Sequence, residues 1–477
     1  MGAGGSGRFH GLNTMMSTAQ PAMSLSAHGA PLPKEEGREE VASADVAEVR
    51  ARLDAAPMSW TQVIAIAITF LLSAVDGYDV LSVTFAAPAL PLAWGVGKAA
   101  LGVVLAAGLA GMALGAFLLA PLADLFGRKP MILAALVLMV LGMGCCALAG
   151  SLPQLALFRV IAGLGIGGCV AIITPVAAEF ANARYRPFTL AIMAIGYPVG
   201  GVIGGLLAAL LLSLHDWRAV FVAGAIAAAL LVPVVMLLLP ESLAYLLTRR
   251  GPGTLERVNA VLARCGQPPM VALPEGKAPG KRGYAALFAG RQRGATLWIT
   301  AVNLLLVFTI YFFLSWMPQM IADAGFPAAS ASLASAVANF AGIAGGLLLG
   351  WLGRRRSLRA LVAGHMLLLG VATIAFGMMP PVFPLLLLVG GICGFCLFAA
   401  ASGMYATLAS TFGDEARASG TGFVSGTGRI SSAIAPAAAG WLFHAGLGPA
   451  SVSLIFGSCS LAAALLLFGG WNRFRPS

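Results

Sequence analysis

Two aspartates interrupt one of the most apolar stretches of the chain, and their type and spacing could support proton chemistry. Asp76 and Asp79 lie in the run TQVIAIAITFLLSAVDGYDVLSVTF, three residues apart and therefore on one face of a helix. Carboxyl groups are costly in hydrocarbon, so acids in such a run usually mark the pathway of a proton or a polar solute. We therefore expect both aspartates to take part in moving protons.

The composition places these aspartates in a lipid bilayer. Of 477 residues, 59% are hydrophobic and 10% are charged, which is far from the balance of soluble globular domains. Twelve apolar stretches are long enough to cross roughly 30 Å of hydrocarbon as helices. We expect these spans at residues 62–84, 100–122, 130–150, 153–176, 188–213, 217–239, 296–318, 331–352, 357–379, 382–405, 419–442 and 450–471.

A polar stretch rich in proline and glycine divides the twelve spans into two sets of six. The pattern predicts an all-α integral membrane protein with two pseudo-symmetric six-helix halves, in residues 58–240 and 296–477. Residues 241–295 are expected to form a cytoplasmic central loop, and residues 1–57 a cytoplasmic N-terminal tail.

The tail has no charged-then-apolar pattern of a secretory signal peptide. Its first 33 residues are rich in Gly, Ser, Ala and Pro, a composition typical of disorder. Residues 35–54 favour a short surface helix with Val46, Val49 and Leu53 on one side. We expect the tail to be solvated and without a direct functional role.

The positive charges predict the orientation in the membrane. If the N-terminus is inside, all 29 lysines and arginines lie on the inner side except Lys98, Arg218 and the two within spans, Arg159 and Arg429. The net charge of +11 is thus explained by topology, and we expect no nucleic-acid partner. The prediction is a multi-pass protein of the cytoplasmic (inner) membrane with both termini in the cytoplasm, functional as a monomer.

Cysteine and histidine patterns argue against a metal site or an enzyme. Cys393 and Cys396 lie inside an apolar span without a partner pair, so packing explains them. The histidines do not cluster, and only His365 lies in a span. No GxxxxGK[ST] loop is present. We expect no cofactor, no metal and no enzymatic activity.

The loop between the second and third spans resembles the signature loop of the major facilitator superfamily, G-x-L-a-D-r-x-G-R-k. Asp124, Gly127, Arg128 and Lys129 match this pattern, while Ala120 replaces its first glycine. An acid at a helix end can pair with basic and amide groups of the neighbouring half. The motif therefore predicts an inner gate.

The fourth span carries Arg159, followed by Gly163 and Gly165 in a pattern similar to that superfamily's R-x-x-x-G-x-G. Glu179 lies twenty residues further on, about 30 Å along a helix, so these two charges cannot pair with each other. We expect Arg159 to pair with the aspartates of the first span. Glu179 is expected to pair with Arg128 or Arg186 in the gate.

Arg429 should lie near the middle of the bilayer, about ten residues into the eleventh span. A guanidinium at that depth needs an anion, either from the protein or from a bound substrate. The substrate is favoured, because Asp76 and Asp79 belong to the other half. The candidate ring contacts, each of which could instead serve only in packing, are Tyr78, Tyr197, Tyr311, Phe312, Phe340 and Tyr405.

A narrower resemblance follows from the first span, where Asp76-Gly77-Tyr78-Asp79 and a later Ala-Pro-Ala-Leu resemble the D-G-[FY]-D…aPAL signature of the aromatic acid:proton symporters. The resemblance runs from about residue 50 to 470. It also rests on Leu53–Met58, Pro240-Glu241-Ser242, Ser315-Trp316-Met-Pro318 and the pair Arg417 and Arg429. It implies that both aspartates are required for transport, and that Arg159, Glu179, Arg417, Arg429 and His365 belong to the functional set.

The expected function is secondary active, proton-coupled uptake of small aromatic carboxylates such as benzoate. The fifth span lacks the G-P-x-x-G-G arrangement of proton-coupled exporters and has Gly196-Tyr-Pro198-Val-Gly200-Gly201 instead, which favours uptake. The alternatives are an importer of another organic acid or a sugar, a proton antiporter that exports drugs or metabolites, and a non-transporting sensor on the same bundle.

Overall fold

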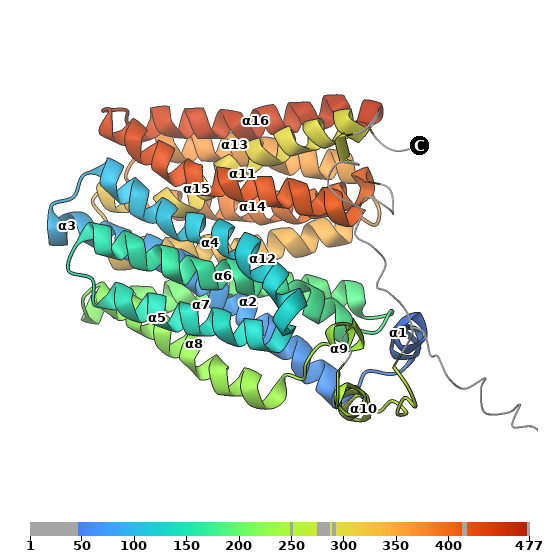
Figure 1. Ribbon diagram of the computed structural model, residues 1–477. Helices are drawn as coiled ribbons and strands as arrows, with labels where there is room; N and C mark the ends of the chain where they lie inside the picture. Colours follow the sequence, from blue (N-terminus) through green and yellow to red (C-terminus); the bar gives the residue numbers. More distant parts are fainter. Residues whose placement is uncertain (1–45, 249–250, 274–286, 289–291, 413–416, 475–477) are drawn as a thin grey trace, which may run out of the picture. The chain divides into compact units, whose positions relative to one another are not determined.

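The computed structural model describes residues 46–248, 251–273, 287–288, 292–412 and 417–474. These segments form an all-helical bundle (Figure 1). The long helices are α2 (Trp60–Ala86), α4 (Lys98–Phe126), α5 (Arg128–Ala147), α6 (Leu152–Phe180), α7 (Arg186–Leu214) and α8 (Arg218–Leu238), then α11 (Gln292–Asp323), α12 (Ala328–Leu352), α13 (Leu358–Met378), α14 (Phe383–Thr411), α15 (Arg417–His444) and α16 (Pro449–Phe474).

Eleven of the long helices in the described residues are apolar enough to cross a membrane. The remaining one, α15, is less apolar because Gly, Ser and Thr and the charge of Arg429 interrupt it. Each of the twelve helices overlaps one predicted span, with ends that lie at most a few residues to either side of the predicted ones. The predicted fold class, twelve helices in two six-helix halves, is confirmed.

The two halves repeat one packing scheme. In the first half α4 packs on α6, α2 on α7, and α5 on α8. The equivalent pairs of the second half, α12 with α14, α11 with α15, and α13 with α16, pack in the same way. This repetition is the internal symmetry typical of transporters, whose sites lie between the repeats.

Close helix contacts position the central charges. A Cβ on Gly111 of α4 would lie 2.3 Å from the carbonyl oxygen of Val160 in α6, and one on Gly115 would lie 2.0 Å from that of Leu164. Only glycine therefore permits this backbone approach. It brings α4 against the α6 turn that carries Arg159.

Local residues fix the ends of two of these helices. α2 starts at a capping box, in which the Ser59 hydroxyl accepts from the Gln62 amide and the Gln62 side chain accepts from the Ser59 amide at 2.9 Å. Gly127 connects α4 to α5. Its φ of 109° lies in a region that favours glycine over residues with a side chain.

The two ends of the bundle differ in charge. We call the end that carries Arg128, Lys129, Arg184 and Arg186 the basic end, and the other, where α4 begins, the opposite end. The halves pack tightly toward the opposite end: a Cβ on Gly102 of α4 would lie 2.9 Å from Gly440 Cα of α15. In the structure the halves are thus closed together at the opposite end.

Three short helices lie at the basic end: α1 (Val46–Ala55), α9 (Leu243–Thr248) and α10 (Thr254–Arg264) (Figure 1). The expected short helix of the tail is present as α1, with Val49 and Leu53 both buried. They pack in one apolar cluster with residues of α9 and α10. The expectation that this helix is merely solvated is wrong for its apolar side. The disorder expected for residues 1–33 lies outside the described residues.

Candidate functional site

Asp79 and Arg159 form a buried ion pair in the first half. The Arg159 guanidinium donates from Nη1 to Asp79 Oδ1 at 2.7 Å and from Nη2 to the Asp79 carbonyl at 3.0 Å. Its Nη1 also lies 3.3 Å from the Ser82 hydroxyl. Both residues are only 1% exposed. The pairing expected between Arg159 and the first span is therefore observed. It gives Asp79 Oδ1 a partner, whereas Asp79 Oδ2 has none among the described residues.

We predict that Asp79→Ala strongly destabilises the protein, because it leaves the Arg159 charge buried without its carboxylate, at a cost of about 3–5 kcal/mol. Thermal unfolding in detergent measures this effect. The double variant Asp79→Ala/Arg159→Leu should recover much of the lost stability. Asp216→Ala is the matched control, because it breaks an exposed ion pair with Arg218 that contributes about 0–1 kcal/mol. An equal loss in Asp79→Ala and Asp216→Ala would contradict the prediction.

Asp76 differs from Asp79 although it lies only one turn away. It is also 1% exposed, yet neither of its carboxyl oxygens has a hydrogen-bond partner among the described residues. An isolated buried carboxylate is very costly, so such a group is stable when it carries a proton or meets a cation. Asp76 is therefore the acid in this region that is available for proton exchange.

Arg429 of α15 is the cation of the second half that faces Asp76. Its charge acts electrostatically on the Asp76 carboxyl group and on the Tyr311 hydroxyl. Within the described ranges, no carboxylate lies within ion-pair distance of Arg429. The structure thus brings an unpaired acid and an unpaired base together from the two halves.

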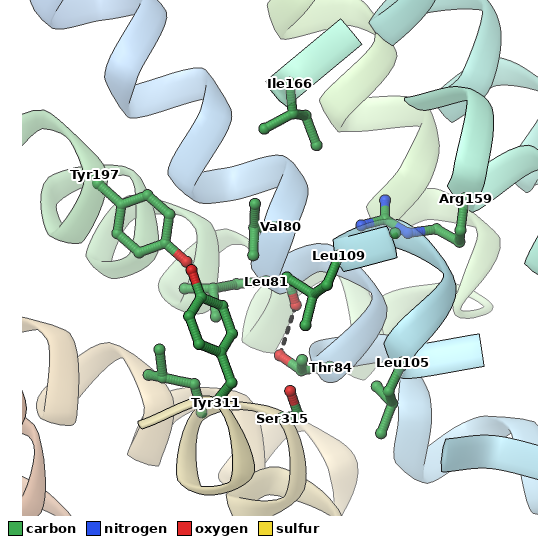
Figure 2. A pocket seen from close by; sticks show the side chains of 12 residues that line it. Val80, Leu81, Thr84, Leu105, Leu109, Arg159, Ile166, Tyr197, Tyr311 and Ser315 are labelled. Atoms are coloured by element: carbon green, nitrogen blue, oxygen red, sulfur yellow. Dashed lines mark hydrogen bonds between the residues drawn. The ribbon is translucent and has the colours of Figure 1, made fainter. Parts of the chain in front are cut away.

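A cavity lies between the halves next to this pair. Its walls come from α2, α4, α6, α7 and α11. Figure 2 shows Tyr197 of α7 and Tyr311 of α11 pointing their hydroxyl groups toward each other at one side, and Arg159 at the other. Among the described residues no cluster of His, Cys, Asp and Glu suits a metal ion. The lining combines many apolar side chains with a few polar groups, the composition typical of sites for small organic ligands.

The other aromatic candidates separate into two groups. Tyr405 is 64% exposed and acts electrostatically on Tyr311, but it does not line the cavity, so its role as a ring contact stays a prediction. Tyr78 does not reach the cavity, because its ring packs against Gly204 and Gly224 and its hydroxyl donates to the Val220 carbonyl at 2.6 Å.

Phe340 and Phe312 also lie elsewhere. Phe340 is 67% exposed and shares its face of α12 with exposed Leu333, Leu347 and Trp351, an arrangement typical of a lipid-facing stripe. Phe312 is buried and stacks on Phe456 with ring centroids 4.2 Å apart. None of Tyr78, Phe312 and Phe340 lines the cavity, so their role as ring contacts stays a prediction.

The basic end holds the network expected to form a gate. Glu179 pairs with Arg128 and accepts a hydrogen bond from the Ser242 hydroxyl. Glu241 accepts from the backbone amides of Arg128 at 2.9 Å and Lys129 at 3.2 Å. The glutamate after α8 thus caps the start of α5, where the dipole favours an anion. A Cβ on Gly127 would lie 2.5 Å from Glu241 Oε2, so the signature glycine makes room for this cap.

Arg186 pairs with Asp54 of α1 and not with Glu179. Asp54 also lies 3.1 Å from Arg50, which donates to the carbonyls of Glu179 and Ala178 at 2.7 and 3.0 Å. Burial and the nearby positive charge of Arg186 lower the pKa of Arg50. Helix α1 therefore belongs to the network through side chains that the sequence analysis did not select.

The remaining gate candidates take different positions. Lys129 donates to the Met236 carbonyl at 2.8 Å, and Asp124 is exposed near the end of α4. Arg417 begins α15, but its side chain lies outside the described residues. His365 of α13 bonds its own helix, with Nδ1 2.7 Å from the Leu361 carbonyl, so it does not join the cavity.

One ion pair links the two halves at the opposite end. Lys98 of α4 lies 2.7 Å from Asp323 of α11, and Asp323 also accepts from Gln319 at 2.9 Å. Lys98 is one of the basic residues that the charge pattern left on the outer side. The pair joins the ends of helices from different halves, so it stabilises closure there.

We predict that Asp323→Lys opens the opposite end, because it sets two positive charges against each other where a partly exposed pair had contributed up to about 1 kcal/mol. The swap Lys98→Asp/Asp323→Lys should restore closure. Distances between spin labels placed on cysteines at Leu92 and Ala328 report the change. Asp216→Lys serves as a control at the same end. Equal label distances in wild type and Asp323→Lys would refute a latch.

Comparison with known proteins agrees with this geometry. Residues 67–379 and 299–476 match the Major Facilitator Superfamily. A gallate transporter of Pseudomonas putida is 31% identical over 441 residues, which cover 90% of this chain and 96% of that protein. The 4-hydroxybenzoate transporter PcaK of Pseudomonas aeruginosa is 30% identical, with 88% of this chain and 96% of that protein covered.

A benzoate transport protein of Acinetobacter baylyi is 25% identical, with 81% of this chain and 84% of that protein covered. Among solved structures, the crystal structure of a D-xylose-proton symporter superposes with a TM-score of 0.66 at 17% identity, covering 87% of this chain and 98% of that one. The fold, the matched family and the relatives agree. The chain belongs to the major facilitator superfamily, in the group that contains these aromatic acid transporters, and is a multi-pass membrane transporter and not an enzyme.

Proposed function

We propose that this protein imports small aromatic monocarboxylates together with protons. The observation that carries the proposal is the central pair of unpaired groups: Asp76 from the first half and Arg429 from the second, beside a cavity lined by both halves. The transport of gallate, 4-hydroxybenzoate and benzoate by the relatives supports aromatic acids as the substrate class.

Coupling follows from competition for one guanidinium. A substrate carboxylate and an ionised Asp76 both favour Arg429, and the two anions repel each other. The substrate is therefore accepted best when Asp76 carries a proton. When the substrate leaves, the charge of Arg429 stabilises the ionised Asp76 and promotes release of the proton. Binding of the proton and of the substrate thus favour each other.

The halves then rock around the site to expose it on alternate sides. The protein lies in the cytoplasmic (inner) membrane. Its basic end faces the cytoplasm, and both termini are on that side. The halves are closed together at the opposite end by Lys98 with Asp323 and by Gly102 against Gly440. We assign this arrangement to the state in which the site is open to the cytoplasm. The network of Glu179, Arg128 and Asp54 gates the other side. We also propose one copy of the chain as the functional unit, because Asp76, Arg429 and the cavity all belong to it.

Uptake into proteoliposomes tests the proposal. Radiolabelled 4-hydroxybenzoate and benzoate are added outside with an inward proton gradient, and protein-free liposomes measure passive diffusion of the neutral acids. We expect gradient-driven accumulation above that baseline. Accumulation of neither acid, in protein shown to be folded, would overturn the aromatic assignment. Vesicles preloaded with the acid are also placed under the same inward proton gradient. If they lose the acid faster than protein-free liposomes do, the result would favour a proton antiporter that exports.

A further inference from the structure

Tyr197 carries a buried hydroxyl group whose hydrogen-bonding capacity is unused. Its oxygen is buried and has no partner among the described residues, although it lines the cavity. Tyr78 shows the usual outcome for a tyrosine in this bundle, because its hydroxyl donates to the Val220 carbonyl. Buried polar groups are nearly always paired, so an unpaired one inside a ligand cavity requires an explanation.

The position of Tyr197 is fixed by backbone contacts. The Tyr197 carbonyl packs on Gly77 of α2, where a Cβ would lie only 2.1 Å from its oxygen. A Cβ on Gly200, one turn along α7, would lie 1.8 Å from the Ala74 carbonyl oxygen. The ring also contacts Phe398 of α14, with centroids 6.3 Å apart. The backbone of Tyr197 is therefore held against the turn of α2 that carries Asp76, and its ring against α14.

Polar atoms from both halves surround this hydroxyl. Tyr311 of α11 points its hydroxyl toward that of Tyr197 (Figure 2), and Asp76 acts on Tyr197 electrostatically. Ser315, one turn further along α11, also lines the cavity and is only 4% exposed. The rest of the wall is mainly aliphatic, with Val80, Leu81 and Leu109. The cavity thus combines a mainly aliphatic wall with the facing hydroxyl groups of Tyr197 and Tyr311 (Figure 2).

We propose that Tyr197, assisted by Tyr311, recognises a hydroxyl group on the ring of the substrate. The proposal rests on the proposed function, in which Arg429 holds the carboxylate. A phenol hydroxyl donates one hydrogen bond and accepts others, so it complements a tyrosine hydroxyl that has no partner of its own. Tyr197 is then a specificity-determining residue, which favours hydroxylated aromatic acids over benzoate.

The discrimination follows from the cost of leaving Tyr197 unpaired. Benzoate packs against the aliphatic wall but offers no partner to the hydroxyl, whereas a correctly placed ring hydroxyl completes its hydrogen bonds. We expect wild type to bind its best hydroxybenzoate at least about tenfold more tightly than benzoate. Tyr197→Phe removes the group that distinguishes them. It should weaken binding of that isomer by about tenfold and change benzoate binding by less than about threefold.

Binding to purified, detergent-solubilised protein tests this inference. Affinities for benzoate and for 2-, 3- and 4-hydroxybenzoate are measured by calorimetry in wild type, Tyr197→Phe and Tyr311→Phe. Tyr185→Phe is the matched control, because Tyr185 directly precedes α7 and lies at the basic end away from the cavity. Thermal unfolding of each variant checks its fold.

Loss of the preference in Tyr197→Phe, with benzoate affinity kept, supports the inference. A preference that survives in Tyr197→Phe would overturn it, as would an equal loss for all four acids, since both results give Tyr197 only a packing role. Wild-type binding of benzoate and every hydroxybenzoate with equal affinity would overturn it while leaving the proposed function intact. Wild type that binds none of the four acids would overturn the proposed function and this inference with it.

Discussion

Asp76→Asn is expected to reduce proton-driven accumulation of substrate to the level of protein-free liposomes. Asparagine has nearly the shape of a protonated aspartic acid, so the cavity keeps its form but cannot release a proton. The coupling scheme requires the buried carboxyl group of Asp76, which has no hydrogen-bond partner in the part of the chain that the structure describes. Exchange of labelled for unlabelled substrate across the membrane needs no net proton movement, and it should continue in this variant.

The combination of lost accumulation and retained exchange distinguishes coupling from binding. Asp216→Asn is the control, because it removes the charge of an exposed acid that pairs with Arg218 at 2.6 Å. That variant should accumulate substrate like wild type. If Asp76→Asn accumulates substrate normally under a proton gradient, Asp76 is not the coupling group.

Arg429→Gln is expected to weaken substrate binding by about 2–5 kcal/mol, the cost of truncating one partner of a buried, hydrogen-bonded charge pair. This loss corresponds to at least about a 30-fold increase in Kd. The reason is that no carboxylate within the described ranges pairs with Arg429. The anion that binds Arg429 is therefore supplied by the ligand. Equilibrium binding of a labelled hydroxybenzoate measures the effect.

Two further variants sharpen this test. Arg429→Lys keeps the charge but loses the planar fork of donors, so binding should fall by less than in Arg429→Gln. Arg218→Gln removes an exposed arginine at the opposite end and should leave Kd unchanged. Unaltered affinity in Arg429→Gln would show that the carboxylate binds elsewhere.

The membrane helices were predictable because their signal is local. Each needs a long apolar run, and the bilayer sets its length. The least apolar helix, α15, was still found because its polar residues are small and Arg429 is isolated among them. The pair of Asp79 with Arg159 was also accessible, since a charge in a span must meet its counter-charge at the same depth.

Side-chain direction was not predictable in the same way. Tyr78 lies directly beside Asp79 in sequence, yet it fills a gap left by Gly204 and Gly224 on two other helices. Phe340 lies at a suitable depth, yet its side chain is exposed and does not line the cavity. Neither outcome can be read from one helix, because each depends on which neighbours approach it.

The role of α1 was missed for a related reason. Arg50 and Asp54 look like ordinary surface charges in sequence, and only docking of Val49 and Leu53 into the apolar cluster brings them to α6 and α7. One signal was present. Asp54 lies just before the first span, on the side where positive charges gather, which predicts a salt-bridged position.

The most direct measurement of the central claim is proton entry that depends on substrate. Proteoliposomes containing a pH-sensitive dye are held at zero membrane potential, and 4-hydroxybenzoate is added outside at neutral pH. Wild type should acidify the lumen faster than protein-free liposomes, with about one proton for each labelled acid taken up, whereas Asp76→Asn should match the protein-free rate. Uptake of the acid by wild type without acidification beyond the protein-free rate would contradict proton coupling.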